Sequence, residues 1–165
     1  MESELTRKIV LPEIGPNLFI RGTLPQVPDL PQRLRASGCR VVFSLHRKGE
    51  PLLESAVGPD GAEVIRYHHQ QLVDSSKHVD EETAVALARR VAFYLDRDYG
   101  TLVACMGGRN RSALIATMAA MLSWGIDAHE AILRVKRARP TAFENQYFEQ
   151  WVREWDPTPI QALST

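Results

Sequence analysis

Residues 101–122, TLVACMGGRNRSALIATMAAML, place a short polar loop between two apolar runs. The first run, TLVAC, is too short for a helix and too apolar for a surface loop, so it predicts a central strand buried on both faces. The second run, from about Arg111 onward, is apolar nearly all round and predicts a buried helix. The segment that joins the two runs, from Cys105 to Arg111, contains one cysteine, two glycines and two arginines.

The rest of the chain alternates between strand patterns and helix patterns. NLFIRG, CRVVFSLH and EVIRYHHQ are short runs rich in β-branched or aromatic residues and bounded by turn residues. Helices are expected over 29–38, in a short segment ending at Gly58, and over 80–100, 127–140 and 144–155, with Asp29, Asp80 and Asp127 as N-caps. This alternation predicts an α/β fold with a central, mostly parallel sheet and helices on both faces.

Length and charge limit the class of protein. A chain of 165 residues with 44% hydrophobic residues suits one domain, which we expect over residues 1–156, followed by a loosely ordered tail over 157–165. The 20 basic and 20 acidic residues balance, so the chain as a whole lacks the charge of a nucleic-acid or membrane-surface binder.

Membrane insertion and secretion are not expected. The longest apolar run, residues 113–122, has about half of the roughly 20 residues that a membrane span requires. The N-terminus has no apolar run long enough for a signal peptide, and two cysteines are too few for a disulfide framework. We therefore expect a cytoplasmic protein with free thiols.

The loop after TLVAC is suited to binding an anion. Backbone N–H groups of a turn containing Gly107 and Gly108 can converge on one point, and the helix behind it adds free N–H groups and a positive dipole end. Arg111 can donate two hydrogen bonds to two oxygens of one phosphoryl group. The same positive field favours the thiolate of Cys105, which is the nucleophilic form. One loop thus supplies a nucleophile and a phosphate site.

A displaced alkoxide or phenoxide also needs a proton donor. In an α/β sheet the donor should come from another loop at the carboxyl edge of the strands, and Asp74 follows the strand EVIRY at that edge. Asp80 lies nearby but is explained as a helix N-cap. His68 and His69 have no cysteine or histidine partner at metal-ligand spacing, so no metal site is expected, and Cys39 is expected in the core.

The run from Cys105 to Ser112 resembles the signature of the protein tyrosine phosphatase superfamily: cysteine, five residues, arginine, then serine or threonine. The chain is similar to the small dual-specificity branch, from NLFIRGTLP through the Asp74 loop to EAILRVKRARPTAFENQYFEQW. The resemblance implies that Cys105 forms a cysteinyl-phosphate and that Ser112 helps the thiolate to leave. Asp74 is implied first as general acid and then as base.

The resemblance also implies which residues hold the phosphoryl group. They belong to the loop itself, with Arg111 binding the phosphoryl oxygens in the transition state: Met106, Gly107, Gly108, Arg109, Asn110 and Arg111. No metal and no other cofactor is implied. The expected activity is hydrolysis of phosphomonoesters, either phosphotyrosine and phosphoserine or phosphothreonine in proteins or a small phosphomonoester, within a shallow cleft.

Three positions leave other readings open. Ala104 stands where the family usually has a histidine, which leaves a phosphate-binding protein without turnover as an alternative. Arg109 is similar to a basic residue of relatives that act on phosphoinositides, and Asn110 to one in RNA 5′-triphosphatases, so lipid or RNA 5′-phosphates are alternative substrates. Arsenate reductases and low-molecular-weight phosphatases share the spacing but place it near the N-terminus.

Overall fold

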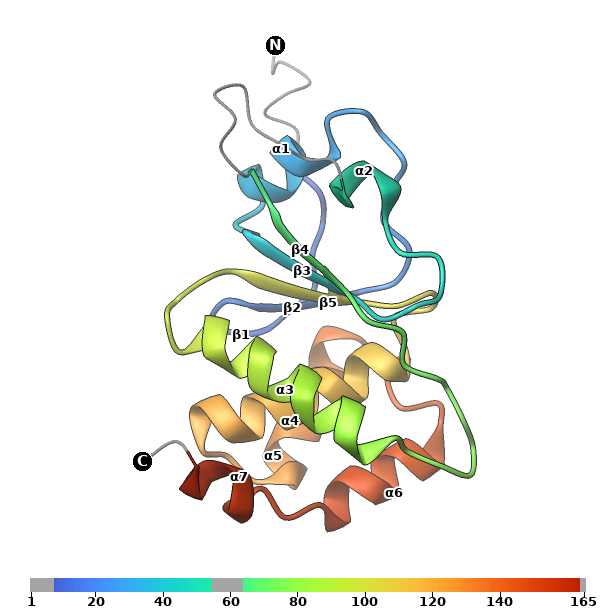
Figure 1. The fold of residues 1–165 in the computed structure, drawn as a ribbon, viewed down its shortest axis with the longest axis vertical. Helices are drawn as coiled ribbons and strands as arrows, with labels where there is room; N and C mark the ends of the chain where they lie inside the picture. Colours follow the sequence, from blue (N-terminus) through green and yellow to red (C-terminus); the bar gives the residue numbers. More distant parts are fainter. Residues whose placement is uncertain (1–7, 55–63, 164–165) are drawn as a thin grey trace.

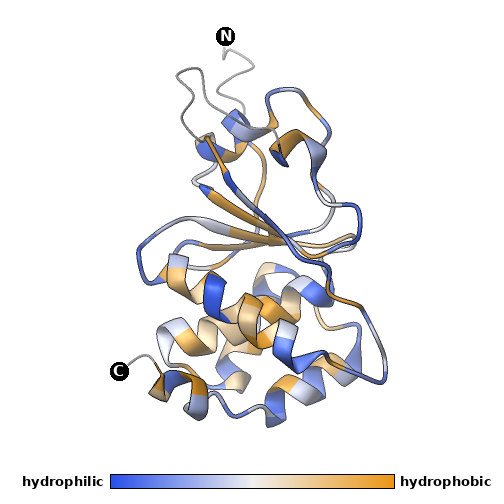
Figure 2. Ribbon diagram, viewed as in Figure 1, coloured by the Kyte–Doolittle hydropathy of each residue, from blue (hydrophilic) through white to orange (hydrophobic). Residues whose placement is uncertain are grey.

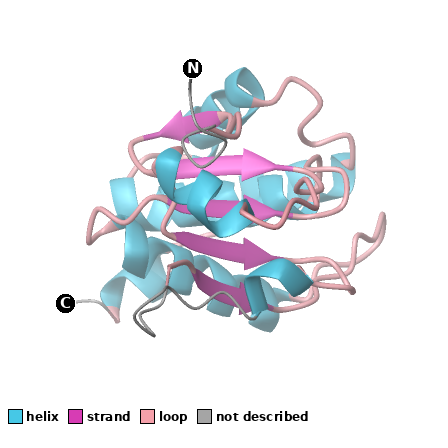
Figure 3. Ribbon diagram, turned by 90° about the horizontal axis from the view of Figure 1, so that it is seen from above, coloured by secondary structure: helices cyan, strands magenta, loops and turns pink. Residues whose placement is uncertain are grey.

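The computed structural model describes residues 8–54 and 64–163, and the expected helix end at Gly58 lies outside them. A five-stranded sheet has the order β1-β2-β5-β3-β4. The parallel strands are β2 (Leu18–Arg21), β5 (Thr101–Ala104), β3 (Val41–Ser44) and β4 (Arg66–His69). The short strand β1 (Glu13–Gly15), which no sequence pattern indicated, pairs antiparallel with β2. The expected mostly parallel sheet is confirmed (Figure 3).

Helices cover both faces of the sheet (Figure 1). The helices α1 (Leu30–Ala36) and α2 (Pro51–Glu54) lie on one face. The other face carries α3 (Glu81–Leu95), α4 (Arg111–Trp124), α5 (Ala128–Ala138), α6 (Gln146–Glu154) and α7 (Thr158–Ala162). None of the helices in the described ranges is long and apolar enough to cross a membrane.

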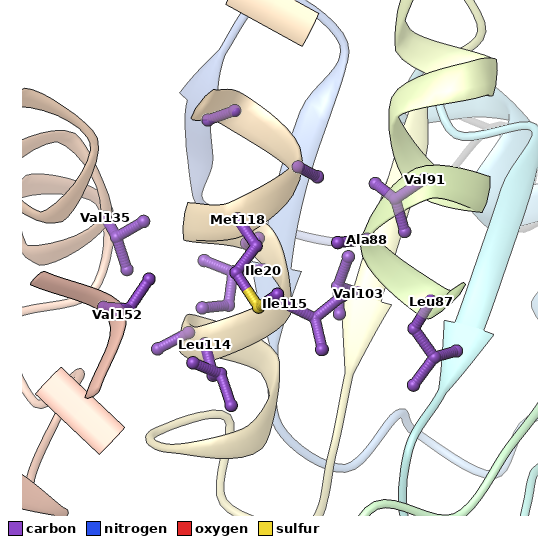
Figure 4. Close-up of a cluster of buried hydrophobic side chains, with 14 of the residues drawn as sticks. Ile20, Leu87, Ala88, Val91, Val103, Leu114, Ile115, Met118, Val135 and Val152 are labelled. Atoms are coloured by element: carbon purple, nitrogen blue, oxygen red, sulfur yellow. The ribbon is translucent and has the colours of Figure 1, made fainter. Parts of the chain in front are cut away.

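The larger core fills the space between the sheet and the helices α3 and α4. Figure 4 shows Val103 of β5 and Ile115 and Met118 of α4 pointing into it beside Leu87 of α3. Every residue from Ser112 to Met121 is buried, and the visible part of α4 is mostly hydrophobic in colour in Figure 2. Burying one such aliphatic side chain stabilises the fold by about 1.5–3 kcal/mol. The two segments on either side of the loop, β5 and α4, are therefore fixed in place by core packing.

Two helix ends differ from the sequence prediction. Helix α3 ends at Leu95 rather than at Gly100. Gly100 instead lies where a Cβ atom would be 1.8 Å from the backbone oxygen of Gly38, so the close approach of two chain segments excludes a side chain. Asp29 occupies the N-cap position of α1, but its carboxylate accepts a hydrogen bond from Arg33 Nε (2.8 Å) and not from the helix backbone.

Part of the tail that we expected to be loosely ordered forms α7. Pro157 and Pro159 set backbone angles that suit a first helical turn, and the Thr158 N–H donates to the Asp156 carboxylate (2.9 Å). Ile160 packs against the larger core. The two prolines thus lie at the start of a short helix.

Candidate active site

Cys105 directly follows the central strand β5, at the carboxyl edge of the sheet. Its N–H donates to the backbone oxygen of Arg21 (3.3 Å), so the ladder between β2 and β5 continues up to the cysteine. The side chain is only 3% exposed. Helix α4 begins six residues later at Arg111, which places the helix N-terminus behind the loop as the sequence predicted.

Three carbonyl groups of the loop are held by residues outside it. Met106 O accepts from the N–H (3.1 Å) and the hydroxyl (3.0 Å) of Thr23. Gly107 O accepts from Arg139 Nη2 (2.8 Å), and Arg109 O accepts from the Phe143 N–H (2.7 Å). In a trans peptide the C=O and N–H groups point in opposite directions. These contacts therefore turn the N–H groups of the next residues, Gly107, Gly108 and Asn110, into the loop.

The sulfur of Cys105 has two polar neighbours. The Gly108 N–H donates to Sγ (3.2 Å), as the orientation of its peptide requires. Ser112 Oγ, fully buried in the first turn of α4, lies 3.2 Å from the same sulfur. Both groups can donate to a thiolate, so the loop can hold a negative charge on this atom.

Arg111 provides hydrogen-bond donors beside the loop that contains Cys105. Its Nη1 donates to the Leu72 backbone oxygen (3.5 Å), and its Nε is buried with no hydrogen-bond partner among the residues that the structure describes. A buried donor without a partner is unfavourable unless a ligand satisfies it. The guanidinium is therefore suited to receive the oxygens of an anion.

Asp74 is brought to the loop by two amides. Asn110 Nδ2 donates to Asp74 Oδ2 (2.9 Å), and Asn145 Nδ2 donates to Asp74 Oδ1 (2.7 Å). The Asn145 N–H in turn donates to Asn110 Oδ1 (2.8 Å), which fixes the orientation of the Asn110 amide. The aspartate that the sequence placed at this edge of the sheet thus contacts the loop containing Cys105.

Arg109 points out of the loop. Its Nη1 lies 3.0 Å from Glu144 Oε2, and the two side chains are 51% and 64% exposed. An exposed ion pair of this kind contributes about 0–1 kcal/mol. Arg109 therefore forms an ion pair at the surface. In this arrangement its guanidinium does not point towards the Cys105 sulfur.

Thr23, Arg139 and Asn145 are the contacts that the sequence analysis missed. Asn145 caps α6 by accepting from the Phe148 N–H (3.2 Å), and it also holds Asp74. Thr23 follows strand β2 at the carboxyl edge, a position that could have indicated it. No pattern indicated Arg139, which follows the end of α5.

The remaining cysteine and the alanine before the loop pack in the smaller core beside α1. Cys39 is fully buried as expected, and burial raises the pKa of its thiol to about 12, so it stays protonated. Ala104 is buried in the same cluster. In residues 8–54 and 64–163, no group of three or more histidine, cysteine or acidic side chains could hold a metal ion.

Comparison with solved structures shows which known proteins share this fold. A mouse putative dual-specificity phosphatase, crystallised with zinc tungstate, superposes with a TM-score of 0.70 at 22% identity, over 92% of this chain and 89% of that chain. Human DUSP28 gives 0.68 at 22% identity, over 91% and 97% of the two chains. No family model and no curated protein matches the sequence.

The chain has the fold of the dual-specificity phosphatases, the small branch of the tyrosine phosphatase superfamily that its sequence resembles. The same fold occurs in a human tyrosine phosphatase-like serine/threonine/tyrosine-interacting protein, with a TM-score of 0.68 at 18% identity over 90% and 96% of the chains. Function is therefore argued from the side chains of the site and not from the fold alone.

Proposed function

We propose that this protein is a cysteine-dependent phosphatase that hydrolyses phosphomonoesters, phosphotyrosine and phosphoserine or phosphothreonine in proteins, through a cysteinyl-phosphate. The observation that carries the proposal is the set of donors around one sulfur. The Gly108 N–H and Ser112 Oγ each lie 3.2 Å from Cys105 Sγ, and Arg111 Nε is buried without a partner in the same loop. The first two donors can stabilise the thiolate, and a dianionic phosphoryl group bound by Arg111 would face this nucleophile.

In the first step the Cys105 thiolate attacks phosphorus, and the bond from phosphorus to the ester oxygen breaks. Arg111 and the inward N–H groups bind the three equatorial oxygens, whose charge grows in the transition state. Asp74 gives its proton to the leaving oxygen. To present that proton, one carboxyl oxygen of Asp74 must release the amide of Asn110 or Asn145 that now donates to it.

In the second step water attacks the cysteinyl-phosphate, and the bond from phosphorus to sulfur breaks. Asp74, now a carboxylate, accepts the proton of the water. The amides of Asn110 and Asn145, which donate to its two carboxyl oxygens, hold it beside the loop. Ser112 donates to the departing sulfur and stabilises the thiolate.

Turnover of p-nitrophenyl phosphate by the purified protein tests the proposal. Cys105→Ser should abolish the steady-state rate, since a serine hydroxyl is a far weaker nucleophile than a thiolate. Cys39→Ala, which removes the thiol that is not in the loop, is the matched control and should keep most of the rate. An inactive parent protein, or a Cys105→Ser variant as fast as the parent, would contradict the proposal.

Asp74→Asn tests the proton donor separately. The asparagine has no proton to give the leaving oxygen, so we expect kcat to fall about 100-fold, within the range for loss of a general acid. The loss should be smaller for p-nitrophenyl phosphate than for a phosphoserine peptide, whose leaving oxygen is more basic. Asp80→Asn is the matched control, because asparagine still caps α3. Equal losses in both variants would remove Asp74 from the mechanism.

A further inference from the structure

The outer face of α3 presents one aromatic and three basic side chains. Arg89, Arg90, Phe93 and Arg97 are exposed, whereas the opposite face of the helix packs in the larger core. Arg89, Phe93 and Arg97 follow one another at four-residue spacing, so they form one stripe along the helix. Phe93 is 47% exposed, and the guanidinium carbon of Arg97 lies 3.4 Å from the centre of its ring. Exposed aromatic and arginine side chains together are typical of protein–protein interfaces.

Two cavities lie on either side of Phe93. The first has a volume of about 500 Å³ and is lined by α3 and the edge strand β4, through His68, Ala86, Arg89, Arg90, Phe93 and Tyr94. The second, of about 420 Å³, is also lined by residues of α4 and α7 and shares Arg89 and Phe93 with the first. Because the cavities share these two residues, one extended ligand can occupy both.

The three arginines of this face lack carboxylate partners. In residues 8–54 and 64–163, no acidic oxygen lies within ion-pair distance of Arg89, Arg90 or Arg97. Arg90 Nη2 donates to His68 Nδ1 (2.7 Å), and Arg97 Nη1 donates to the Phe93 backbone oxygen (2.9 Å). Each guanidinium carries five N–H groups, so most of these donors are available to a ligand.

The first cavity favours an anion. Its lining contains no acidic side chain. Burial, and then the charges of Arg90 and Arg66, lower the pKa of His68 to about 4, so its imidazole is neutral at pH 7. Because Nδ1 of this neutral ring accepts from Arg90, its Nε2 carries the proton and donates to the Tyr94 hydroxyl (2.9 Å). The hydroxyl proton of Tyr94 can then be donated to a ligand in the cavity.

We propose that this face of α3 docks a short acidic segment of a partner protein, with a carboxylate in the first cavity and an apolar side chain against Phe93. Guanidinium groups bind carboxylates through parallel N–H donors, and an apolar side chain would cover the exposed ring. None of the residues that line the two cavities belongs to the loop from Cys105 to Arg111. The inference therefore goes beyond the proposed reaction and does not depend on it.

The second cavity distinguishes a peptide from a strand of nucleic acid. Its lining adds the carboxylate of Asp96, which accepts from Ser123 Oγ (2.6 Å), and the apolar side chains of Leu122 and Ile160. A nucleic acid strand carries a phosphate at each nucleotide and would place one near this carboxylate, where the two charges repel. A peptide can instead place its carboxylate in the first cavity and an apolar side chain in the second.

Selection from a phage-displayed library of short random peptides, with the purified full chain as target, tests the proposal. We expect the enriched peptides to share aspartate or glutamate next to an aliphatic or aromatic residue. A synthetic peptide of the enriched sequence is then titrated by fluorescence anisotropy. Arg89→Glu should weaken its binding at least tenfold, because it reverses a charge that both cavities share. Phe93→Ala should weaken it about tenfold, because an aromatic contact is lost.

Two substitutions on α5 serve as controls for these variants. Arg137→Glu reverses the charge of an exposed arginine, and Leu133→Ala truncates an exposed apolar residue, and neither residue lines the two cavities. Both variants should bind the peptide as the parent does. Urea midpoints equal to that of the parent show that each variant is folded.

Three results would overturn the inference. The first is a selection that enriches no acidic and apolar motif, or a peptide whose affinity falls equally in Arg89→Glu and Arg137→Glu. The second is loss of binding in Arg111→Ala, which would place the peptide at the loop that contains Cys105. The third is an oligouridylate that binds more tightly than the peptide and with the same dependence on Arg89. Each result can be read whether or not the protein hydrolyses a phosphomonoester.

Discussion

Gly108 combines a backbone conformation that suits glycine with a hydrogen bond to the Cys105 sulfur in the phosphate loop, residues 105–111. Its φ angle is +64°, in the left-handed region, and a Cβ atom there would lie 2.4 Å from the Gly22 nitrogen. Its N–H donates to Cys105 Sγ. A side chain at this position is therefore strained by the backbone angle and blocked by neighbouring backbone, and relief of either moves the donor away from the sulfur.

Gly108→Ala should lower kcat/KM for p-nitrophenyl phosphate at least tenfold. Gly107→Ala is the matched control, because the atoms nearest to its Cβ would belong to the flexible side chain of Arg109, at 3.6 Å or more, and its φ angle is not positive. It should stay within about threefold of the parent. Similar rates for the two variants would show that the loop tolerates a side chain where the geometry excludes one.

At the residue scale, the sequence predicted a site from groups that are adjacent in the chain. Cys105, Arg111 and Ser112 share one short motif, and Asp74 was found through the rule that strand ends meet at one edge of the sheet. Thr23 and Arg139 reach the loop from separate elements through hydrogen bonds to its carbonyl groups. Such contacts depend on three-dimensional placement: only the position of Thr23 after β2 hints at its contact, and no pattern indicates that of Arg139.

At the element scale, the start of α6 supports the site directly. Asn145 accepts from the Phe148 N–H as the N-cap, and its amide donates to Asp74 and to the Ser75 backbone oxygen. One side chain thus fixes where the helix begins and where the proposed general acid lies.

Substitutions at Asn145 should separate these two roles. Asn145→Asp keeps a good N-cap but replaces the amide donor by a carboxylate that repels Asp74, so kcat should fall about tenfold although the helix is still capped. Asn145→Ala loses the cap as well, which costs about 1 kcal/mol of the free energy of unfolding. Urea denaturation and kcat of both variants check this. A fully active Asn145→Asp protein would show that Asp74 needs no amide from α6.

Element boundaries were the less predictable part of the fold. The capping residues Asp80 and Asp127 were found because each side chain accepts from the helix backbone three residues on, a local feature. The role of Gly100 was misread, because its lack of a side chain serves the contact with Gly38 and not the end of α3. Close contacts between distant segments leave no periodic signal.

At the scale of the whole molecule, alternating strand and helix patterns were enough to predict the mostly parallel sheet with helices on both faces. The central place of β5 in the sheet was predicted from its continuous apolar pattern, which indicates burial on both faces, whereas its two neighbours were not predicted. The strand β1 was missed because three residues are too few for a pattern.

The stability of the fold should depend on His68 in weakly acidic solution. Burial, and then the charges of Arg90 and Arg66, lower the pKa of His68 from 6.5 to about 4. Arg90 Nη2 donates to His68 Nδ1 (2.7 Å), a bond that protonation of that nitrogen would remove. Because the unfolded chain takes up a proton between these pH values and the folded chain does not, the free energy of unfolding should fall as the pH drops from 6.5 towards 4.

Urea midpoints measured between pH 6.5 and 4.5 check this prediction. His68→Gln keeps a hydrogen-bond donor and an acceptor but cannot take up a proton, so its midpoint should fall less steeply with acid than that of the parent protein. A slope identical to the parent's would assign the acid sensitivity to other groups.

The most direct test of the account is to trap the covalent intermediate. The protein is mixed with a phosphotyrosine peptide, quenched in acid within its first turnovers, digested, and analysed by mass spectrometry. We predict one phosphoryl group on the peptide that contains Cys105, and none on that peptide in Cys105→Ser. Turnover of the substrate without a phosphoryl group on Cys105, or with one on another residue, would contradict the mechanism.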